Sequence, residues 1–500
     1  MLSVSRRNFD LIGVRAAEVA KVNQGSVATI DNYQHASHQP LHASDIDAAM
    51  WRIEKDPLLR QTIAAVLILD QPPDREMLLD RLERASRTLP TFRHRLVEAP
   101  LQLSTPRWLV DLNFDLSYHV RWIGAPGGGS LDGVLEFARQ STMSGLDRDR
   151  PLWAITVVEG LKGDQAAVII KMDHAMADGV ALLAILSLLG DFTRKPRDLG
   201  AMPPIPEPES QSVVDLAAEA VAYTGHRIVG LVGQLANSAA RTIPAVVLRP
   251  VHTVSNVGKN VRALVKLRTP LLKTLSPVMT GRRGWLRFAA LEFDLERLRN
   301  AATSRACTVN DAFVTAVAHG FALYHQRHGK PVERLRAAIA VNIRKPGDSP
   351  FGNRVRGGAI ALPVSADDPA GAMAIYHDLV KELKEEVRLP LVPRVDTMVT
   401  ALGPVVSFLF GMLMKHDDIA ITNVRAGDEA LYLAGAKVIS VYPFGPLIGC
   451  AANCTLVGYN HKAFVGINVD AAAVPDLDML TGCIQEGFNA VIALSDNVSD

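Results

Sequence analysis

Residues 166–189 read AAVIIKMDHAMADGVALLAILSLL, and they place two different patterns side by side. Residues 167–172 are apolar and rich in β-branched side chains, which predicts a buried strand. From Val180 onward leucine and isoleucine recur at helical spacing, which predicts a helix. A strand end holds side chains still and yet exposes them. The short connection between the two elements carries Asp173, His174, Asp178 and Gly179.

His174 is the candidate for chemistry in this connection. Histidine can accept a proton near neutral pH because its unperturbed pKa is about 6.5. A base that activates a hydroxyl needs this property and a fixed orientation. The simpler alternative is a half-buried histidine bonded to the backbone, with Asp178 capping the next helix. A metal site made of Asp173, His174 and Asp178 is disfavoured, since no second histidine or cysteine stands at ligand spacing nearby.

The composition narrows the class of protein. A chain of 500 residues predicts two domains. Hydrophobic residues make up 48% of the chain, and the mean hydropathy is slightly positive, which favours a lipid-like ligand or a membrane surface. A net charge of +1 gives no reason to expect nucleic acid as a partner.

The four cysteines indicate the compartment. They show neither zinc-site spacing nor a disulfide framework, which predicts a reducing compartment and no metal. The first residues lack the long apolar core of a signal peptide, so we expect a cytoplasmic protein. The cysteines are Cys307, Cys450, Cys454 and Cys483.

Changes in composition and residue pattern along the chain divide it into four parts. Strand and helix patterns alternate in both halves, so each half is expected to be an α/β sandwich. Residues 195–210 are rich in proline and charge, as a linker is. The predicted parts are an N-terminal tail (1–40), a first domain (41–200), a basic apolar connector (201–284) and a second domain (285–500).

The connector has an unusual charge pattern. Between Ala220 and Leu291 there is no Asp or Glu, while Arg and Lys are interspersed with Leu, Val and Ala. This pattern suggests an interfacial helix on an anionic membrane. The alternative is a solvated helical connector packed on the domains. Residues 398–414 are also apolar, but they are short for a membrane span and predict a buried helix.

Residues 173–179, DHAMADG, resemble the HHxxxDG signature of the bacterial wax ester synthase/diacylglycerol acyltransferases. This family belongs to the coenzyme A-dependent acyltransferases, whose common core is HxxxD. The resemblance runs from about Leu41 to the C-terminus. Its further blocks lie, in order, at residues 89–93, 106–108, 114–119, 146–148, 150–153, 309–311, 421–424, 431–436 and 468–470.

The resemblance implies an α/β fold of two similar acyltransferase domains with a tunnel at their interface. Acyl-CoA is then a co-substrate that enters from one side, and no cofactor or metal is needed. The acceptor is a diacylglycerol or a long-chain alcohol that enters from the other side. The protein is expected to associate peripherally with a membrane or a lipid droplet, and its oligomeric state stays open.

The resemblance also implies roles for single residues. His174 is the general base, and Asp178 turns inward, pairs with an arginine and holds the loop. Gly179 lets the chain turn tightly into the helix. Asn310 or Asn423 would donate to the carbonyl oxygen that gains charge. The structural alternatives are that Asn310 and Asp311 cap a helix, and that Gly435 and Gly466 form turns rather than contacts.

The sequence departs from the family pattern at two places. Asp173 replaces the first histidine of the signature, and a carboxylate beside His174 would raise its pKa. Arg425 and Ala426 replace a Pro-Gly pair. Two further readings therefore stay open: an acyltransferase of the same fold that acts on another hydroxyl, such as a polyketide or glycolipid, and a catalytically silent lipid-binding homologue.

Overall fold

The structure is a computed structural model that describes residues 42–102, 104–207, 214–226, 229–230, 273–344, 355–387, 411 and 414–495. The predicted tail, most of the basic connector and most of the predicted helix at 398–414 lie outside the described residues.

The first sheet has seven strands, in the order β4-β5-β6-β1-β13-β12-β7. Its centre is antiparallel, with β1 paired to β6 on one side and to β13 on the other. Almost every residue of β1 and β6 is buried, because both strands are mainly apolar. The strands are β1 (Thr62–Leu69), β4 (Val120–Gly124), β5 (Trp153–Glu159), β6 (Ala166–Asp173), β7 (Gly190–Asp191), β12 (Tyr432–Leu433) and β13 (Ala436–Phe444).

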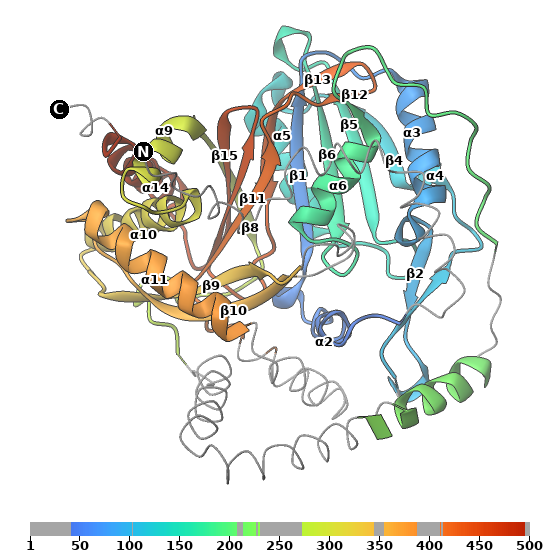
Figure 1. Ribbon diagram of the computed structural model, residues 1–500, viewed down its shortest axis with the longest axis horizontal. Helices are drawn as coiled ribbons and strands as arrows, with labels where there is room; N and C mark the ends of the chain where they lie inside the picture. The colour runs from blue at the N-terminus through green and yellow to red at the C-terminus, as the bar shows by residue number, and fades with distance from the viewer. Residues whose placement is uncertain are drawn as a thin grey trace, which may run out of the picture.

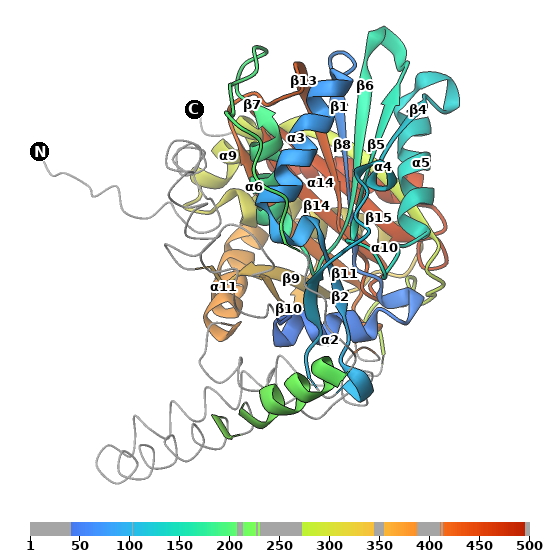
Figure 2. The ribbon, with the colours of Figure 1, turned by 90° about the vertical axis from the view of Figure 1, so that its right-hand side faces the viewer.

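Helices and a small ribbon complete this half. Helices α3 and α6 pack against each other beside the sheet (Figure 2). Strand β4 begins at Val120, directly after a single helical turn that Asp115 caps. The elements are α2 (Asp45–Ile53), α3 (Arg75–Thr88), β2 (His94–Val97), β3 (Arg107–Val110), α4 (Leu116–His119), α5 (Leu131–Met143) and α6 (Gly179–Leu189).

The second sheet has six strands, in the order β10-β9-β11-β14-β15-β8. Helices α9, α10, α11 and α14 cover its outer side (Figure 1). The strands are β8 (Leu286–Asp294), β9 (Arg334–Asn342), β10 (Val355–Pro363), β11 (Ile419–Gly427), β14 (Ala452–Tyr459) and β15 (Lys462–Asp470). The helices are α9 (Leu295–Thr303), α10 (Val309–Arg327), α11 (Pro369–Val387) and α14 (Leu477–Ala493).

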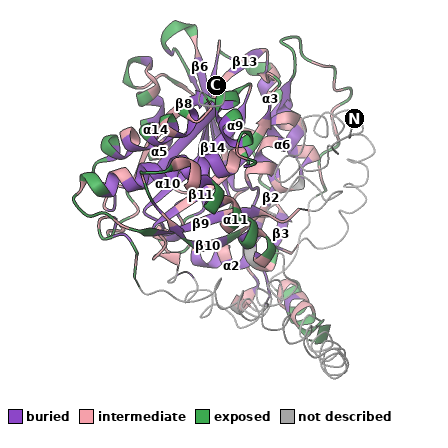
Figure 3. Ribbon diagram, turned by 60° about the vertical axis from the view of Figure 1, so that its left-hand side comes forward, coloured by how far each residue is buried: buried purple, intermediate pink, exposed green. Residues whose placement is uncertain are grey.

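Each sheet has its own core, and the buried residues follow the two sheets and their covering helices (Figure 3). The predicted class, an α/β fold of two sandwich-like halves, is confirmed. The second half is not self-contained, however, because β12 and β13 belong to the first sheet. The prediction of one domain over residues 285–500 was therefore wrong for these two strands, since strand pattern alone does not say which sheet a strand joins.

The two sheets adjoin where β15 crosses β13. Gly466 lies inside β15, and a Cβ atom at this position would lie 1.6 Å from the carbonyl oxygen of Pro443. Only glycine permits this approach of two backbones. The expectation that Gly466 forms a turn was wrong. Gly435, with φ of +82°, does lie in a turn.

Candidate active site

His174 stands directly after β6, between the two sheets. Its backbone N–H donates to the carbonyl oxygen of Gln61 at 3.1 Å, which fixes the chain where it leaves the strand. The side chain is half-buried, and its ring lines a cavity. The Nδ1 atom is buried, and within the described part of the chain it has no hydrogen-bond partner.

The cavity beside His174 is apolar and is formed by both halves of the molecule. It holds about 610 Å³ of empty space, its open mouth included. Leucines of α6 form one wall, and β1, β11, β13 and β14 supply the rest. Such a lining suits a hydrocarbon chain, because burying apolar surface is favourable by about 25 cal/mol per Å². The lining includes Leu182, Leu183, Leu186, Thr422, Val424 and Thr455.

Burial controls the protonation of His174. Desolvation lowers the pKa of the imidazole, because the charged form loses its contact with water. Asp178 acts in the opposite direction, as does the backbone of His174 itself, but burial is the larger cause. The ring is therefore neutral at neutral pH, which is the form that can accept a proton.

Asp178 is completely buried, and it bonds to two parts of the molecule at once. Its Oδ1 atom accepts from the backbone N–H of Ala181 at 2.9 Å, so it caps α6. Its Oδ2 atom accepts from Arg344 at 2.7 Å, and this arginine follows β9 of the second sheet. The predicted pairing of Asp178 with an arginine is present, and it joins the histidine loop to the other half of the molecule.

Gly179 allows α6 to approach β11 closely. A Cβ atom here would lie 2.6 Å from Val424 Cγ2. The residue does not have a positive φ, so the expected reason for a glycine, a tight turn, was wrong. The helix begins with a glycine because a side chain would collide with the second sheet.

Asp173 faces away from His174, since successive side chains of a strand point to opposite sides. It is buried, and its pKa is raised well above the usual value by desolvation and by the nearby Glu54 carboxylate, to which it hydrogen bonds. Its Oδ1 atom accepts from the backbone N–H of Ala175 at 2.8 Å. Glu54 also accepts from the backbone N–H of Gln61 at 3.0 Å. Asp173 is not among the groups that shift the pKa of His174, so the expectation that it raises this pKa was wrong.

The two asparagines proposed as donors to the oxyanion do not line the cavity in the described part of the chain. Asn310 lies in the first turn of α10, where Asp311 forms a capping box with Thr308. The alternative that Asn310 and Asp311 cap a helix is therefore right for Asp311 alone. On β11 the cavity is lined by Thr422 and Val424, so Asn423 points to the opposite face.

Sequence reasoning missed two hydroxyl groups in the cavity wall. Thr422 and Thr455 line the cavity from neighbouring strands, with Thr422 paired to Thr455 in register. The hydroxyl of Thr455 donates to Asn453 Oδ1 at 2.8 Å and is thereby engaged. The alternation along β11 was the signal that would have favoured Thr422 over Asn423.

The second departure from the family pattern lies outside the cavity. Arg425 is exposed, and its guanidinium donates to Asp428 at 3.0 Å. The pairing register of β11 shifts between Arg425 and Gly427, as at a β-bulge. This irregularity replaces the Pro-Gly pair at the end of the strand.

A histidine and a buried aspartate on an HxxxDG connection, facing a cavity between two sheets, define an acyltransferase of the HxxxD type. Two family models match the chain: the wax ester synthase/diacylglycerol acyltransferase catalytic domain at residues 43–313, and the WS/DGAT C-terminal domain at residues 351–491. The chain belongs to the wax ester synthase/diacylglycerol acyltransferase family.

Individual proteins agree with this assignment. A putative diacylglycerol O-acyltransferase of Mycobacterium tuberculosis is 30% identical over 450 residues, which cover 90% of this chain and 91% of that protein. The O-acyltransferase WSD of Acinetobacter baylyi is 27% identical over 485 residues, which cover 92% of this chain and 99% of that protein.

Solved structures share the fold. A wax ester synthase/diacylglycerol acyltransferase of Marinobacter aquaeolei VT8 superposes with a TM-score of 0.58 at 22% identity, covering 91% of this chain and all of that one. The first condensation domain of the CDA synthetase gives a TM-score of 0.59 at 16% identity, covering 92% of this chain and 97% of that one. The protein is an O-acyltransferase of this family.

Proposed function

We propose that the protein transfers an acyl group from acyl-CoA to the hydroxyl of a diacylglycerol or a long-chain alcohol, with His174 as general base. The observation that carries this proposal is a neutral imidazole in the wall of an apolar cavity shared by the two halves. The family names of the relatives support the two kinds of acceptor.

The proposed reaction balances without a covalent enzyme intermediate. The acceptor hydroxyl attacks the thioester carbonyl while its proton passes to an imidazole nitrogen of His174. A C–O bond forms, and the tetrahedral intermediate collapses with cleavage of the C–S bond. The proton then passes from His174 to the sulfur, which releases coenzyme A as a thiol together with the ester.

The negative charge on the carbonyl oxygen needs a donor in the cavity wall. Thr422 is the proposed donor, because it lines the cavity and the hydroxyl of Thr455 is engaged by Asn453. The apolar wall from α6 would hold the fatty chain, with Leu182, Leu183 and Leu186 in contact with it.

Replacing His174 tests the proposed base. Release of free thiol from palmitoyl-CoA is measured with hexadecanol, with dioleoylglycerol and without acceptor, and the ester is quantified. The variant His174→Ala should lose at least about 100-fold in turnover, the lower limit for a general base. His226→Ala, on a helix outside the cavity, is the control. Undiminished turnover in His174→Ala would exclude the base.

The same assay separates the two other readings. An enzyme with a different acceptor would turn over only with another hydroxyl compound from a panel of polyketide and glycolipid alcohols. A silent homologue would bind palmitoyl-CoA and never release thiol with any acceptor.

We also propose peripheral contact with an anionic membrane or lipid droplet. Residues 214–226 form a helix whose inner side bonds to the body of the molecule through Glu219 and Arg107. Val214 and Val221, seven residues apart and on one helical face, are 75% and 61% exposed. No helix among the described residues is long and apolar enough to cross a membrane. Binding to anionic liposomes that weakens as salt rises supports this contact, and binding that ignores salt counts against it.

A further inference from the structure

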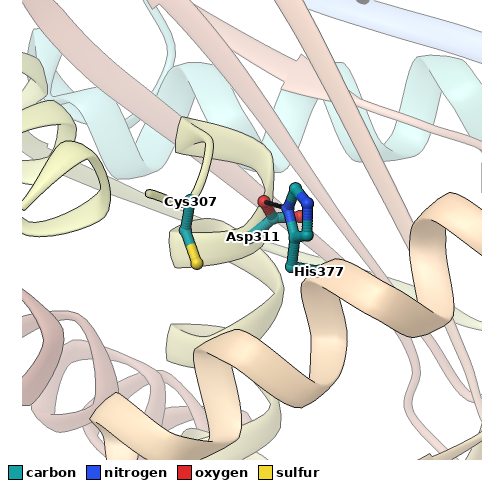
Figure 4. A group of neighbouring side chains, drawn as sticks. All are labelled: Cys307, Asp311 and His377. Carbon is teal, nitrogen blue, oxygen red and sulfur yellow. Dashed lines mark hydrogen bonds and ion pairs between the residues drawn. The ribbon is translucent and has the colours of Figure 1, made fainter. Parts of the chain in front are cut away.

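Three side chains from two segments of the chain meet on the outer side of the second sheet (Figure 4). Cys307 lies just before α10, Asp311 lies in the first turn of α10, and His377 lies on α11. Each offers one atom that can bind a metal ion, and these atoms all lie within 4.8 Å of one another. None of the three lines the cavity at His174, so the cluster is separate from the acyltransferase site.

The carboxylate of Asp311 is held in one orientation. Its Oδ2 atom accepts from the backbone N–H of Thr308 at 2.8 Å and from the hydroxyl of Thr308 at 2.8 Å. His377 Nδ1 donates to the same oxygen at 2.8 Å. Among the described residues no hydrogen bond reaches Oδ1, so this oxygen is available to a cation. The two bonds from Thr308 come from outside the ligand set, and such hydrogen bonds orient the ligands in known metal sites.

Burial and charge at the cluster also suit a cation. Cys307 and Asp311 are 5% and 2% exposed, whereas the His377 side chain is 36% exposed. A buried carboxylate beside a buried thiol is costly unless positive charge is nearby. The two positive charges of a divalent ion would neutralise one thiolate and one carboxylate. A neutral imidazole would be the third ligand. The exposure of His377 leaves a path for the ion and for a water molecule.

The donor set selects the metal. Sulfur, imidazole nitrogen and carboxylate oxygen are the three ligand types of Zn²⁺, at about 2.0–2.3 Å from the ion. Two ligands at tetrahedral angles are then about 3.3–3.8 Å apart. The candidate ligand atoms lie within 4.8 Å of one another, so side-chain movements of about 1 Å would bring them to this spacing. The partly exposed His377 allows such a movement.

We propose that Cys307, Asp311 and His377 bind one Zn²⁺ ion, with water as the fourth ligand, and that the ion links α11 to the start of α10. When the ion binds, the Cys307 thiol releases its proton to solvent, and the His377 imidazole binds through Nδ1 and keeps its proton on Nε2, so that it stays neutral. The ion is not part of acyl transfer, since the cluster lies outside the cavity.

The test uses the full-length protein, stripped with a chelator and then titrated with ZnCl₂ in calorimetry, with bound zinc counted by mass spectrometry. One ion per chain and a higher thermal unfolding temperature with zinc are expected, because an ion that binds only the folded state stabilises it. Cobalt(II) in place of zinc should give thiolate-to-cobalt charge-transfer absorption, which reports the Cys307 sulfur directly.

Variants identify the ligands. Cys307→Ser and His377→Gln should each weaken zinc binding by more than about 100-fold, since even outer residues of metal sites cost 10–100-fold. The matched controls are Cys454→Ala, another buried cysteine, and His226→Gln, a histidine elsewhere on the surface. Circular dichroism without zinc verifies that each variant is folded.

The following results overturn the proposal: no stoichiometric zinc at micromolar concentrations, a cobalt spectrum without the charge-transfer band, or equal affinities in Cys307→Ser and the controls. The Asp311–His377 pair would then be a simple bridge between two helices.

Discussion

The charges around His174 are arranged so that none of them bonds to its ring in the described structure. Both oxygens of Asp178 are engaged, one by the N-terminus of α6 and one by Arg344. The pKa of Asp173, the adjacent carboxyl, is raised by burial and by Glu54, and Asp173 does not act on the pKa of His174. The imidazole is thus governed by burial rather than by an ion pair, and this sets its pH dependence.

The pH dependence of kcat/KM follows from the lowered pKa of His174. The base is active when neutral, so activity is lost as pH falls through this pKa. The acid limb should therefore have its midpoint below about 6.5, the value of an unperturbed histidine. The measurement is kcat/KM with a short soluble acyl-CoA and alcohol from about pH 5 to about pH 9. A midpoint above the unperturbed value would mean that a negative charge, not burial, dominates.

At this scale the sequence predicted His174 and Asp178 and missed most of their partners. The HxxxDG spacing is local, so it can be recognised, and the arginine was expected without a number. Arg344 lies 166 residues from Asp178, and no local pattern connects them. Asp173 was misjudged because adjacency in sequence was taken as adjacency in space, although strand neighbours point apart. The cluster of Cys307, Asp311 and His377 was not predicted, because spacing rules for zinc sites consider only residues that are close in the sequence.

Between elements, the contact that decides the position of the histidine loop is the start of α6 against β11. Gly179 lies against Val424 of β11, and Asp178 bonds to Arg344, which follows β9. The helix therefore contacts the second sheet at its first residues, where its cap also lies. The loop of His174 is consequently held by both halves.

Gly179→Ala tests this contact. Alanine favours helices over glycine by about 1 kcal/mol, yet here the added Cβ would lie 2.6 Å from Val424 Cγ2. We expect a net loss of about 1–3 kcal/mol in the free energy of unfolding, as for overpacked cores. Urea unfolding measures it.

Val424→Ala should relieve the collision in Gly179→Ala, because it removes both methyl groups that approach Gly179 most closely. The double variant should be more stable than the sum of the two single effects predicts, by about 0.5–3 kcal/mol. Simple additivity would show that the collision is not the cause.

Most elements could be predicted from periodicity. The residue pattern predicts strands over 62–69 and 462–470 and helices over 74–88 and 369–387, and β1, β15, α3 and α11 lie within a residue of these bounds. The pattern of β13 predicted a strand correctly, but it carries no information on its neighbours. Its pairing with β1 joins residues 369 to 380 positions apart, and only the folded chain reveals it.

At the scale of the whole molecule, β13 makes the two halves depend on each other. β13 pairs with β1 in the first sheet and lies across β15 of the second, where Gly466 meets Pro443. The first core is incomplete without residues 432–444, which the chain supplies from between β11 and β14 of the second sheet. The halves should therefore unfold together rather than as separate domains.

Leu67→Ala tests this dependence. Leu67 is fully buried in β1, so the variant should lose about 2–5 kcal/mol. Hydrogen exchange measured by mass spectrometry should show faster exchange in β14 and β15 of the other sheet as well. Leu112→Ala, at a side chain that is 61% exposed, is the control. Faster exchange confined to the first sheet would contradict the coupling.

The long interval between β1 and β13 has a consequence for the newly made chain. β1 leaves the ribosome early, and its partner follows only after about 375 residues, or about 20–75 s at 5–20 residues per second. Throughout this time one edge of an almost wholly apolar strand stays open, which is the condition under which chains aggregate. High-yield expression should therefore depend on slow synthesis at low temperature or on a chaperone that shields this edge until translation ends.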